Sequence, residues 1–570
     1  MDLLLEIKKF WKGDVDNSDA TLAKYSRDAS LFEVRPALVV FPKDADDIKN
    51  LVRFVAENKS ANPALSVTVR SAGTCMAGGP LGESIILDVS RYLTPIHSIK
   101  RVAPYSITPL FKGSFPVSIT GEAVVSPGCF YRDFEKATLA EGLLLPCYTA
   151  SKTINSVGGM VGNNSAGELT LRYGKTEDYV KELKVVFADG NEYVVRALSR
   201  SELDAKIAQN DFEGSVYKNI WQLISQNEGD IMAAKPNVSK NSAGYFLWNV
   251  WDEKKQIFDL TKLIVGSQGT LGIVTEITLR LVDVKKHSAL LVMFLYSLDG
   301  LGNVVNDALS VMPESVEAYD DKTMMLAIRF WRGFIKKRGL WGAIKLGFRF
   351  LPEIGLLIRG MPKLVLLVNC AGDDMNEIRG RLTRLQSIMA GYPNTKTRLV
   401  FSPAEAEKYW TIRRDSFALL REHFKGKQTA PFIDDVIVPP AMLPKFFPRI
   451  QKILDDNHLT YNIHGHASNG NFHIIPLLNL GDKVSGDVIL KVADEVYKLV
   501  LEFHGSLTAE HNDGIIRTPY LSLMYGDKIV GLFAQTKDAF DAHNILNPGK
   551  KVGGSKSYIV SHLAGSHPKS

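Results

Sequence analysis

Short apolar runs separated by glycine-rich loops fill the first half of the chain, from about residue 30 to residue 285. Residues 42–58 are predicted to form a helix whose apolar face consists of Ile48, Leu51, Val52 and Val55. Asp189-Gly190 is a turn dipeptide between two strand-like runs and therefore predicts a hairpin. The predicted strands of this region are residues 37–41, 67–70, 84–88, 183–188, 191–195 and 272–279.

A second strand-rich region begins near His287 and continues to about residue 500. Its apolar runs at residues 290–295 and 364–368 predict further strands. The last long segment, residues 518–550, has the pattern of a helix that ends at Asn547-Pro548-Gly549. Because a chain of 570 residues exceeds one ordinary core, we expect two or three domains of α+β structure.

The segment from Ile463 to His473 carries several histidines around Asn469-Gly470, a strong hairpin signal. In a two-residue hairpin His466 and His473 face each other, with Cβ atoms roughly 5 Å apart. Two such imidazoles can share a metal ion, and the carboxylate of Glu510 would complete a His₂Glu set with an open position. The same spacing also fits solvated hairpin residues beside a surface acid, so it leaves both interpretations open.

Composition narrows the class of protein. The chain has 45% hydrophobic and 23% charged residues, and its net charge of +6 gives no reason to expect a nucleic-acid partner. Its four cysteines form no C-x-x-C pair, which argues against a disulfide framework or an iron–sulfur cluster. The N-terminus lacks the apolar core of a signal peptide, and no apolar run reaches ~18 residues. We therefore expect an intracellular protein.

Three glycine-rich stretches, residues 70–80, 156–167 and 266–274, flank predicted strands. Glycines let backbone N–H groups approach a phosphate closely. None of the three stretches is G-x-G-x-x-G, and Gly174-Lys175-Thr176 is not a P-loop because Leu169 occupies its first glycine position. Together the three loops predict a large, extended ligand that carries phosphate.

These stretches, with Pro127-Gly128, Asp189-Gly190 and Asn547-Pro548-Gly549 in the same order, resemble the FAD-linked oxidoreductases of the vanillyl-alcohol-oxidase superfamily. The similarity covers residues 20 to 552 and is strongest to the branch of D-lactate, D-2-hydroxyglutarate and glycolate dehydrogenases. It implies an α+β fold: an FAD-binding domain in two subdomains, an α+β cap domain, and a C-terminal segment that returns to the FAD domain. The expected boundaries are 1–285, 286–510 and 511–570.

The resemblance implies FAD held without a covalent bond, because the first two loops contain no histidine and Cys75 and Cys147 lack a matching context. The first loop would cradle the pyrophosphate, and the other two would line the flavin and ribityl chain. The implied cofactor-binding residues are Arg70, Ser71, Ala72, Gly73, Thr74, Gly78, Gly79, Pro127, Pro146, Ser156, Gly158, Gly159, Gly162, Asn163, Asn164, Ser165, Ala166, Gly174, Gly269, Gly272, Val274 and Asn547.

The resemblance also implies a reaction centre. A divalent cation, usually zinc, would be held by His466, His473 and Glu510, with His511 as the base. A cation on the substrate hydroxyl would stabilise the alkoxide, and by depressing the pKa of the base it would keep that imidazole neutral. Arg413 matches the arginine that binds the substrate carboxylate, and Arg517 matches an arginine that one subgroup has just downstream. We take all three side chains, His511, Arg413 and Arg517, as catalytic candidates.

This chain departs from the pattern of that branch at several positions. Ser468-Asn469-Gly470-Asn471 replaces the usual Gly-Asp-Gly-Asn, and Asn512 follows the Glu-His pair. Ile433 stands where dicarboxylate-specific relatives have a lysine, which argues against 2-hydroxyglutarate as the substrate.

Residues 329–363 carry nine cationic side chains and a single acidic one, Glu353, interleaved with tryptophan and phenylalanine. This composition suits a helix lying at a membrane surface, although core-packed helices with basic flanks would fit as well. We expect the segment to dock the protein on the inner face of the cytoplasmic membrane, where a quinone could accept electrons.

The sequence thus predicts an FAD-dependent dehydrogenase that oxidises a small 2-hydroxy acid, similar to D-lactate, to the 2-oxo acid. Two alternatives stay open. One is a non-redox flavoenzyme similar to the ether-lipid synthases of the same fold. The other is a flavin-binding, membrane-associated module without activity. The sequence leaves the stereochemistry, the electron acceptor and the oligomeric state open.

Overall fold

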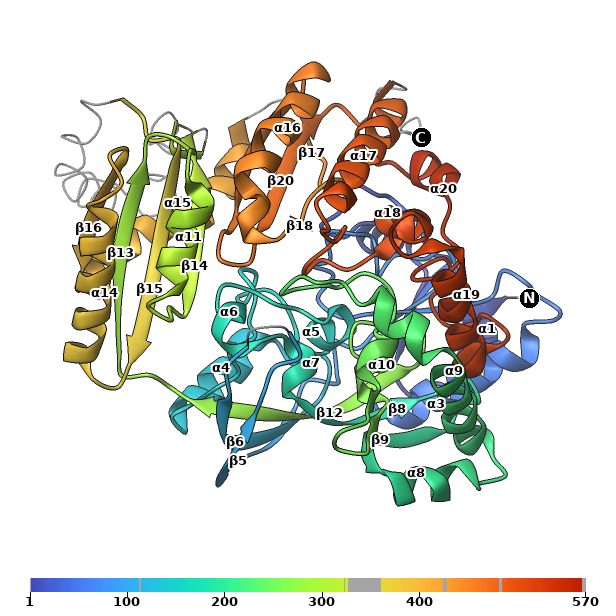
Figure 1. The fold of residues 1–570 in the computed structure, drawn as a ribbon. Helices are drawn as coiled ribbons and strands as arrows, with labels where there is room; N and C mark the ends of the chain where they lie inside the picture. The colour runs from blue at the N-terminus through green and yellow to red at the C-terminus, as the bar shows by residue number, and fades with distance from the viewer. Residues whose placement is uncertain are drawn as a thin grey trace.

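The computed structural model of the protein describes residues 2–111, 114–321, 323–325, 360–423, 428–480 and 484–565. The segment 329–363, predicted to dock on a membrane, lies outside these residues except for its last four. The described residues form three sheets (Figure 1), so the predicted α+β class is confirmed. No helix among the described residues is long and apolar enough to cross a bilayer.

The first sheet is small and mostly parallel. Its strands, in sheet order, are β1 (Asp14–Asp16), β2 (Leu38–Phe41), β4 (Ile85–Asp88) and β3 (Val67–Arg70). Helix α3 (Ala45–Asn58) buries its predicted apolar face in the core beside this sheet. The C-terminal segment returns to strand β3, because Val67 N donates to Ile545 O and Asn547 N donates to Val67 O, both at 2.8 Å.

The second sheet is antiparallel and follows directly in the chain. Its strands, in sheet order, are β10 (Trp251–Asp252), β11 (Ile257–Asp259), β9 (Glu192–Ser199), β8 (Val180–Val186), β12 (Ile273–Asp283), β6 (Val117–Val125) and β5 (Ile96–Ile107), with β7 (Leu143–Leu144) paired to β12. Asp189-Gly190 lies in the β8–β9 turn as predicted, but Val186 pairs with Glu192. The loop is therefore longer than two residues, and of the dipeptide only Gly190 has a positive φ, +74°.

The third sheet carries helices on both faces. Its strands, in sheet order, are β16 (Thr395–Val400), β13 (His287–Leu295), β15 (Leu364–Gly372), β14 (Ser315–Asp320), β19 (Thr460–His466), β20 (Asn471–Leu478) and β17 (Gln428–Thr429), with β18 (Val436–Ile437) paired to β20. Alternate residues of β13 face opposite cores: Leu291 packs with helices α11 (Leu301–Leu309) and α14 (Met375–Met389), whereas Leu290 packs with Tyr409 of helix α15 (Pro403–His423). Figure 1 shows α11 and α14 covering one face.

The final helix ends earlier than its sequence pattern predicts. Helix α19 (Leu521–Asp541) is interrupted at Gly526, which has φ +74°, and stops nine residues before the predicted end at residue 550. The Asp541 carboxylate accepts hydrogen bonds from the backbone N–H groups of Ile545 and Leu546, at 3.0 and 2.8 Å. These bonds turn the chain out of the helix toward the first sheet.

The remaining described helices lie between and around the sheets. They are α1 (Leu3–Lys8), α2 (Asp19–Tyr25), α4 (Tyr131–Ala140), α5 (Val157–Asn163), α6 (Thr170–Tyr173), α7 (Thr176–Tyr179), α8 (Arg200–Ile207), α9 (Phe212–Ala234), α10 (Thr261–Ile264), α16 (Leu443–Asp456), α17 (Val484–Glu502), α18 (Gly514–Arg517) and α20 (Lys556–Ser561), with 3₁₀ turns at Leu247–Asn249, Pro440–Met442 and Thr518–Tyr520.

Candidate active site

A cavity of about 770 Å³ joins the three glycine loops to the histidine hairpin of the third sheet. Residues of the first sheet's loop, of the segment around α5 and of the segment before β12 line one part of it. The predicted cofactor-binding residues that line it are Arg70, Ser71, Ala72, Gly73, Thr74, Gly79, Pro127, Ser156, Gly158, Gly159, Gly162, Asn163, Ser165, Ala166, Gly269, Gly272 and Val274. The other part is lined by Arg413, Asp434, His464, His466, His473, Ile475, Glu510 and His511.

Five predicted cofactor-binding residues do not line this cavity: Gly78, Pro146, Asn164, Gly174 and Asn547. The clearest case is Asn547, which is fully buried. Its Nδ2 donates to the carbonyls of Gly79 and Gln268, at 3.0 and 2.7 Å, and thereby ties two of the loops together. Asn547 therefore supports the loops from behind the cavity wall.

The glycines of the lining leave room for a bound molecule. A Cβ on Gly162 would meet nothing within 4 Å, so this residue faces open space. Gly73 has φ +68°, and a Cβ there would lie 2.4 Å from an Nη atom of Arg70, whose guanidinium is fixed by the carbonyl of Arg27 at 2.8 Å. The buried Oδ1 of Asn163 has no hydrogen-bond partner among the described residues. These features fit a large ligand with hydrogen-bond donors, as FAD is.

The hairpin that carries the histidines differs in register from the prediction. His464, not His466, pairs with His473, and His466 pairs with Asn471. The connection is a four-residue loop, residues 467–470, and of the Asn-Gly pair only Gly470 has a positive φ, +71°. A type I′ turn needs positive φ at both central residues, so the predicted two-residue hairpin is wrong. Because His464 and His466 are two residues apart, both still share a face with His473.

The three predicted metal ligands converge despite this shift. His466 Nε2 lies 3.3 Å from Glu510 Oε1, and His473 Nε2 lies 3.9 Å from Glu510 Oε2. The two rings have centroids 5.6 Å apart. All three side chains are at least nine-tenths buried. Two imidazole nitrogens that face one carboxylate need a proton or a cation between them, so this donor set fits a divalent cation.

Two carboxylates that the sequence analysis missed hold the other nitrogen of each imidazole. His466 Nδ1 lies 2.6 Å from Glu317 Oε1 on β14, and His473 Nδ1 lies 3.2 Å from Asp434 Oδ1, just before β18. Burial would raise the pKa of Asp434, but His511 and His473 outweigh it and hold that pKa well below its usual range. Imidazole–carboxylate pairs of this kind orient metal ligands. No sequence pattern pointed to either acid, because Glu317 and Asp434 lie 149 and 39 positions from the histidines that they bind.

A third buried acid, Asp435, anchors the segment that carries Glu510 and His511. Its Oδ2 accepts the backbone N–H groups of these two residues, at 2.8 and 2.7 Å, and the hydroxyl of Thr508 at 2.6 Å. Its Oδ1 accepts from the side-chain amide of Asn471 at 3.0 Å. The ligand atoms of a different set, Asp435, His473, Glu510 and His511, all lie within 4.8 Å of one another. Because the oxygens of Asp435 already accept four hydrogen bonds, we favour His466 over Asp435 as a ligand.

His511 lies beside the ligands, and its ring stacks on that of His473 with centroids 5.0 Å apart. Its Nδ1 is 2.7 Å from Asp434 Oδ2. Burial lowers the pKa of His511, but the carboxylates of Asp435 and Asp434 outweigh it and raise that pKa to about 9. The protein side chains alone therefore favour a protonated imidazole. The neutral base expected from the sequence thus depends on a cation beside it.

The two predicted arginines lie in different places. Arg413 of α15 lines the cavity, and its Nε and Nη2 lie 3.0 and 2.8 Å from Glu317 Oε2. Arg517 does not line the cavity. Its guanidinium is fully buried and donates to the carbonyls of Asn512 and Asp434, at 2.9 and 2.6 Å. Arg517 therefore braces the backbone of the site, and the catalytic role expected for it stays a prediction.

Two further residues of the site were missed. Lys240 has a fully buried side chain that forms an ion pair with Glu510 Oε1. His464 lines the cavity next to His473, and burial, Arg413 and His473 hold its pKa well below the usual value. No sequence pattern points to Lys240, because it lies 270 residues from its partner.

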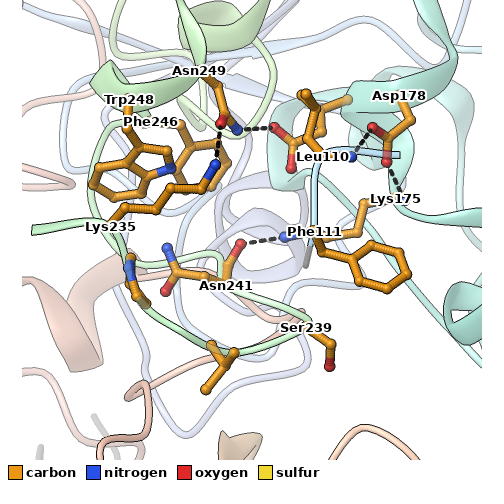
Figure 2. Close-up of a pocket in the computed structure, with 13 residues that line it drawn as sticks. Leu110, Phe111, Lys175, Asp178, Lys235, Ser239, Asn241, Phe246, Trp248 and Asn249 are labelled. Carbon is orange, nitrogen blue, oxygen red and sulfur yellow. Dashed lines mark hydrogen bonds between the residues drawn. The ribbon is translucent and has the colours of Figure 1, made fainter. Parts of the chain in front are cut away.

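Residues of the segment 235–249, which carries Lys240, line a second cavity of about 40 Å³. Figure 2 shows this cavity, with Asn249 between Lys235 and a carboxylate of α7, and Lys175 reaching the carbonyl of Asn241. Ser239 of the same segment accepts a hydrogen bond from the amide of Asn469 at the hairpin tip, at 2.8 Å. These hydrogen bonds fix the segment at several points, which holds Lys240 in place.

The family comparisons agree with this geometry. The FAD binding domain family matches residues 36–196, and the family of FAD linked oxidases, C-terminal domain, matches residues 284–551. The chain belongs to the FAD-linked oxidases. The family resemblance drawn from the sequence motifs is thereby confirmed. The matched FAD-binding domain contains the first two glycine loops.

Relatives with assigned names are similar over nearly the whole chain. The D-2-hydroxyglutarate dehydrogenase of Escherichia coli (strain K12) is 26% identical over 94% of this chain, although the chain spans only half of that relative's length. A glycolate oxidase subunit of Bacillus subtilis (strain 168) is 24% identical, covering 94% of this chain and 93% of the relative. The D-lactate dehydrogenase of Anaerostipes hadrus is 24% identical, covering 95% and 94%.

Solved structures share the fold at low identity. The 4-ethylphenol oxidase of Gulosibacter chungangensis superimposes with a TM-score of 0.66 at 15% identity and covers 97% of both chains. An alkyldihydroxyacetonephosphate synthase gives a TM-score of 0.63 at 13% identity, covering 96% of this chain and 84% of its own. These two enzymes place the FAD-linked oxidase described here in the fold of the vanillyl-alcohol-oxidase type.

Proposed function

We propose that this protein is an FAD-dependent dehydrogenase that oxidises a small 2-hydroxy acid to the corresponding 2-oxo acid. The observation that carries the proposal is the shared cavity, which is lined by the glycine loops and by the histidine–carboxylate cluster. A flavin on the loops would therefore lie next to a substrate on the cluster. The relatives named as glycolate, D-lactate and D-2-hydroxyglutarate enzymes support the same chemistry.

Oxidation of a secondary alcohol requires removal of a proton from the hydroxyl and of a hydride from C2. Bound FAD supplies the hydride acceptor. His511 takes the proton at Nε2, because its Nδ1 is engaged by Asp434 at 2.7 Å. Arg413 lines the same cavity and offers its guanidinium to the substrate carboxylate, while Glu317 fixes that guanidinium through Nε and Nη2.

A divalent cation would be held by Nε2 of His466, Nε2 of His473 and the carboxylate of Glu510. Two imidazoles and one carboxylate suit zinc, and three protein ligands leave a position for substrate. Such a cation would stabilise the alkoxide and lower the pKa of the neighbouring His511 imidazole, which the protein side chains alone raise to about 9. Glu317 and Asp434 keep the two imidazoles in the orientation that exposes Nε2.

The substrate we favour is a short monocarboxylate similar to D-lactate. Ile433, at the position where dicarboxylate-specific relatives have a lysine, is fully buried in the core and does not line the cavity. The position therefore offers no positive charge to a second carboxylate. This argument disfavours 2-hydroxyglutarate despite the names of several relatives.

Anaerobic mixing of the purified FAD-loaded protein with D- and L-2-hydroxy acids tests the proposal. Loss of flavin absorbance at 450 nm, on the order of one equivalent per site, is the expected result for at least one hydroxy acid. A protein that retains FAD but is reduced by none of D- or L-lactate, glycolate and 2-hydroxyglutarate would contradict it. That outcome would favour a non-redox flavoenzyme or an inactive flavin-binding module.

We further propose that residues 329–363 dock the protein on a membrane surface, where a quinone accepts the electrons. The support is the composition of this segment, with nine cationic residues and one acidic residue among aromatic side chains. The expected result is that the protein sediments with anionic vesicles at low salt and is released at high salt, whereas a variant without residues 329–363 stays in the supernatant. Equal recovery of both proteins in the supernatant would assign the segment to the cap.

A further inference from the structure

The ion pair between Lys240 and Glu510 lies within the proposed cation site. Both side chains are buried, and the ammonium contacts Oε1, the same oxygen that His466 Nε2 approaches to 3.3 Å. The ammonium also donates to the carbonyl of Gly167, at 3.4 Å. The strongest partner of Lys240 is therefore an oxygen that the proposed cation would also use.

The buried charges around this pair nearly balance. The carboxylates are Glu317, Asp434, Asp435 and Glu510, and the lysine and arginine side chains are Lys240, Lys175, Arg413 and Arg517. With neutral histidines, the four acidic and four basic side chains balance. A divalent cation therefore gives the cluster a net positive charge, which attracts an anionic substrate. Without Lys240 this net charge would be smaller.

We propose that Lys240 is a built-in counter-charge to Glu510 that weakens the binding of the divalent cation and keeps it exchangeable. The ammonium neutralises the buried carboxylate when no cation is bound, so the folded site does not depend on metal. It repels a bound cation, and this repulsion is strong because both charges are removed from water. The charge of Lys240 also makes the site with bound cation more positive, which favours binding of an anionic substrate. This inference rests on the cation site of the proposed function.

Titration of metal-free protein with Zn²⁺ against a chelating indicator measures the effect directly. Lys240→Met removes the charge and retains most of the side-chain length. The expected result is Zn²⁺ binding at least about tenfold tighter than in the unmodified protein. Lys240→Arg retains the charge and should bind Zn²⁺ as the unmodified protein does. A merely structural lysine would give the opposite order, with weaker binding in Lys240→Met.

Lys551 provides a matched control, because it forms a buried ion pair with Asp513 at 2.9 Å, and both side chains are fully buried. Lys551→Met leaves one buried carboxylate unpaired, as Lys240→Met does, but it does not involve Glu510. It should destabilise the protein without tightening Zn²⁺ binding. Equal tightening in both variants would overturn the inference, because the effect would then be general.

Thermal unfolding gives a second measurement. Lys240→Met should have a lower Tm than the unmodified protein without metal and a larger rise in Tm on adding Zn²⁺. If the metal-free variant does not fold, it can be purified with Zn²⁺, and transfer of the ion to a chelator should then be slower than from the unmodified protein. Unchanged or weaker Zn²⁺ binding in Lys240→Met overturns the inference about Lys240 but leaves the cation site standing. Absence of Zn²⁺ binding in every protein overturns the cation site as well, while flavin reduction by a hydroxy acid tests the dehydrogenase proposal separately.

Discussion

Glu317 accepts a hydrogen bond from His466, with Nδ1 and Oε1 2.6 Å apart, across strands β14 and β19 of the third sheet. The two residues are 149 positions apart in the chain. Glu317 is almost completely buried, and it also binds Arg413. One carboxylate thus fixes a proposed metal ligand and the proposed substrate-binding arginine at the same time.

Glu317→Gln should therefore weaken both functions. The amide retains the shape of the side chain but loses the charge that orients His466 and Arg413. We expect a loss of cation affinity of about 10- to 100-fold, the usual effect of a changed outer partner. KM for the hydroxy acid should rise as well. Glu314→Gln is the control, because Glu314 precedes the same strand and binds Tyr173 instead. Equal Zn²⁺ titrations for the two variants would contradict this role of Glu317.

His511→Gln separates the base from the metal ligands. The variant should keep FAD and cation, because neither His466, His473 nor Glu510 is changed. Anaerobic flavin reduction should slow by roughly 10²- to 10⁴-fold, the usual contribution of a positioned base. His466→Gln should instead lose cation. Metal analysis and stopped-flow absorbance on the same preparations distinguish the two outcomes, and a His511→Gln protein without cation would assign His511 to the ligand set.

A bulky residue at Gly162 should prevent binding of FAD. Gly162 and Gly229 are both helical glycines, and a Cβ on either would meet nothing within 4 Å. Only Gly162 lines the large cavity. Gly162→Leu should therefore yield a folded, colourless protein, whereas Gly229→Leu should remain yellow. Flavin content per protein measures the difference. Full flavin occupancy in Gly162→Leu would show that the cofactor binds elsewhere.

Retention of FAD should depend on pH through Asp28, which lines the cavity near Arg70. Burial raises the pKa of Asp28 to about 6. Below this pH the side chain is neutral, and above it the carboxylate repels the phosphates of FAD. The dissociation constant of FAD should therefore increase as the pH rises through 6 to 7, and Asp28→Asn should remove this increase. Fluorescence of released FAD gives the measurement, and an identical pH profile in Asp28→Asn would exclude Asp28 as the cause.

His464 should influence which hydroxy acid is preferred. It lies next to His473 in the cavity, and its Nδ1 is 3.5 Å from the side-chain amide of Asn462, so we expect Nε2 to be the nitrogen that a substrate meets. His464→Phe should raise KM for hydroxy acids whose side chain can bind this nitrogen, such as glycerate, and leave KM for 2-hydroxybutyrate nearly unchanged. Because His464 is not expected to take part in proton transfer, kcat should change little. An equal fold-change in KM for both acids would indicate that His464 packs in the site and does not recognise the substrate.

Sequence patterns predicted those elements well whose form depends mainly on residues close together in the chain. The helix of residues 42–58 appears as α3 with its predicted apolar face buried, because a 3.6-residue period determines which side chains can reach a core. Both predicted turns, Asp189-Gly190 and Asn469-Gly470, lie between paired strands. Their registers were wrong, since the loops are longer than two residues. Register depends on which side chains the whole sheet must bury, and a dipeptide does not contain that information.

The residues of the proposed site also fall into two groups: those that the sequence reveals and those that only the structure reveals. Its ligand types and the adjacent glutamate–histidine pair could be recognised from the sequence, because imidazoles and carboxylates suit only a few kinds of chemistry. Glu317, Asp434 and Lys240 could not, because each acquires its role from a partner far away in the chain: His466, His473 or Glu510. The sequence by itself thus determined which groups are available for chemistry. The tertiary structure decided which of them are buried together, and burial makes their charges interact strongly enough to matter.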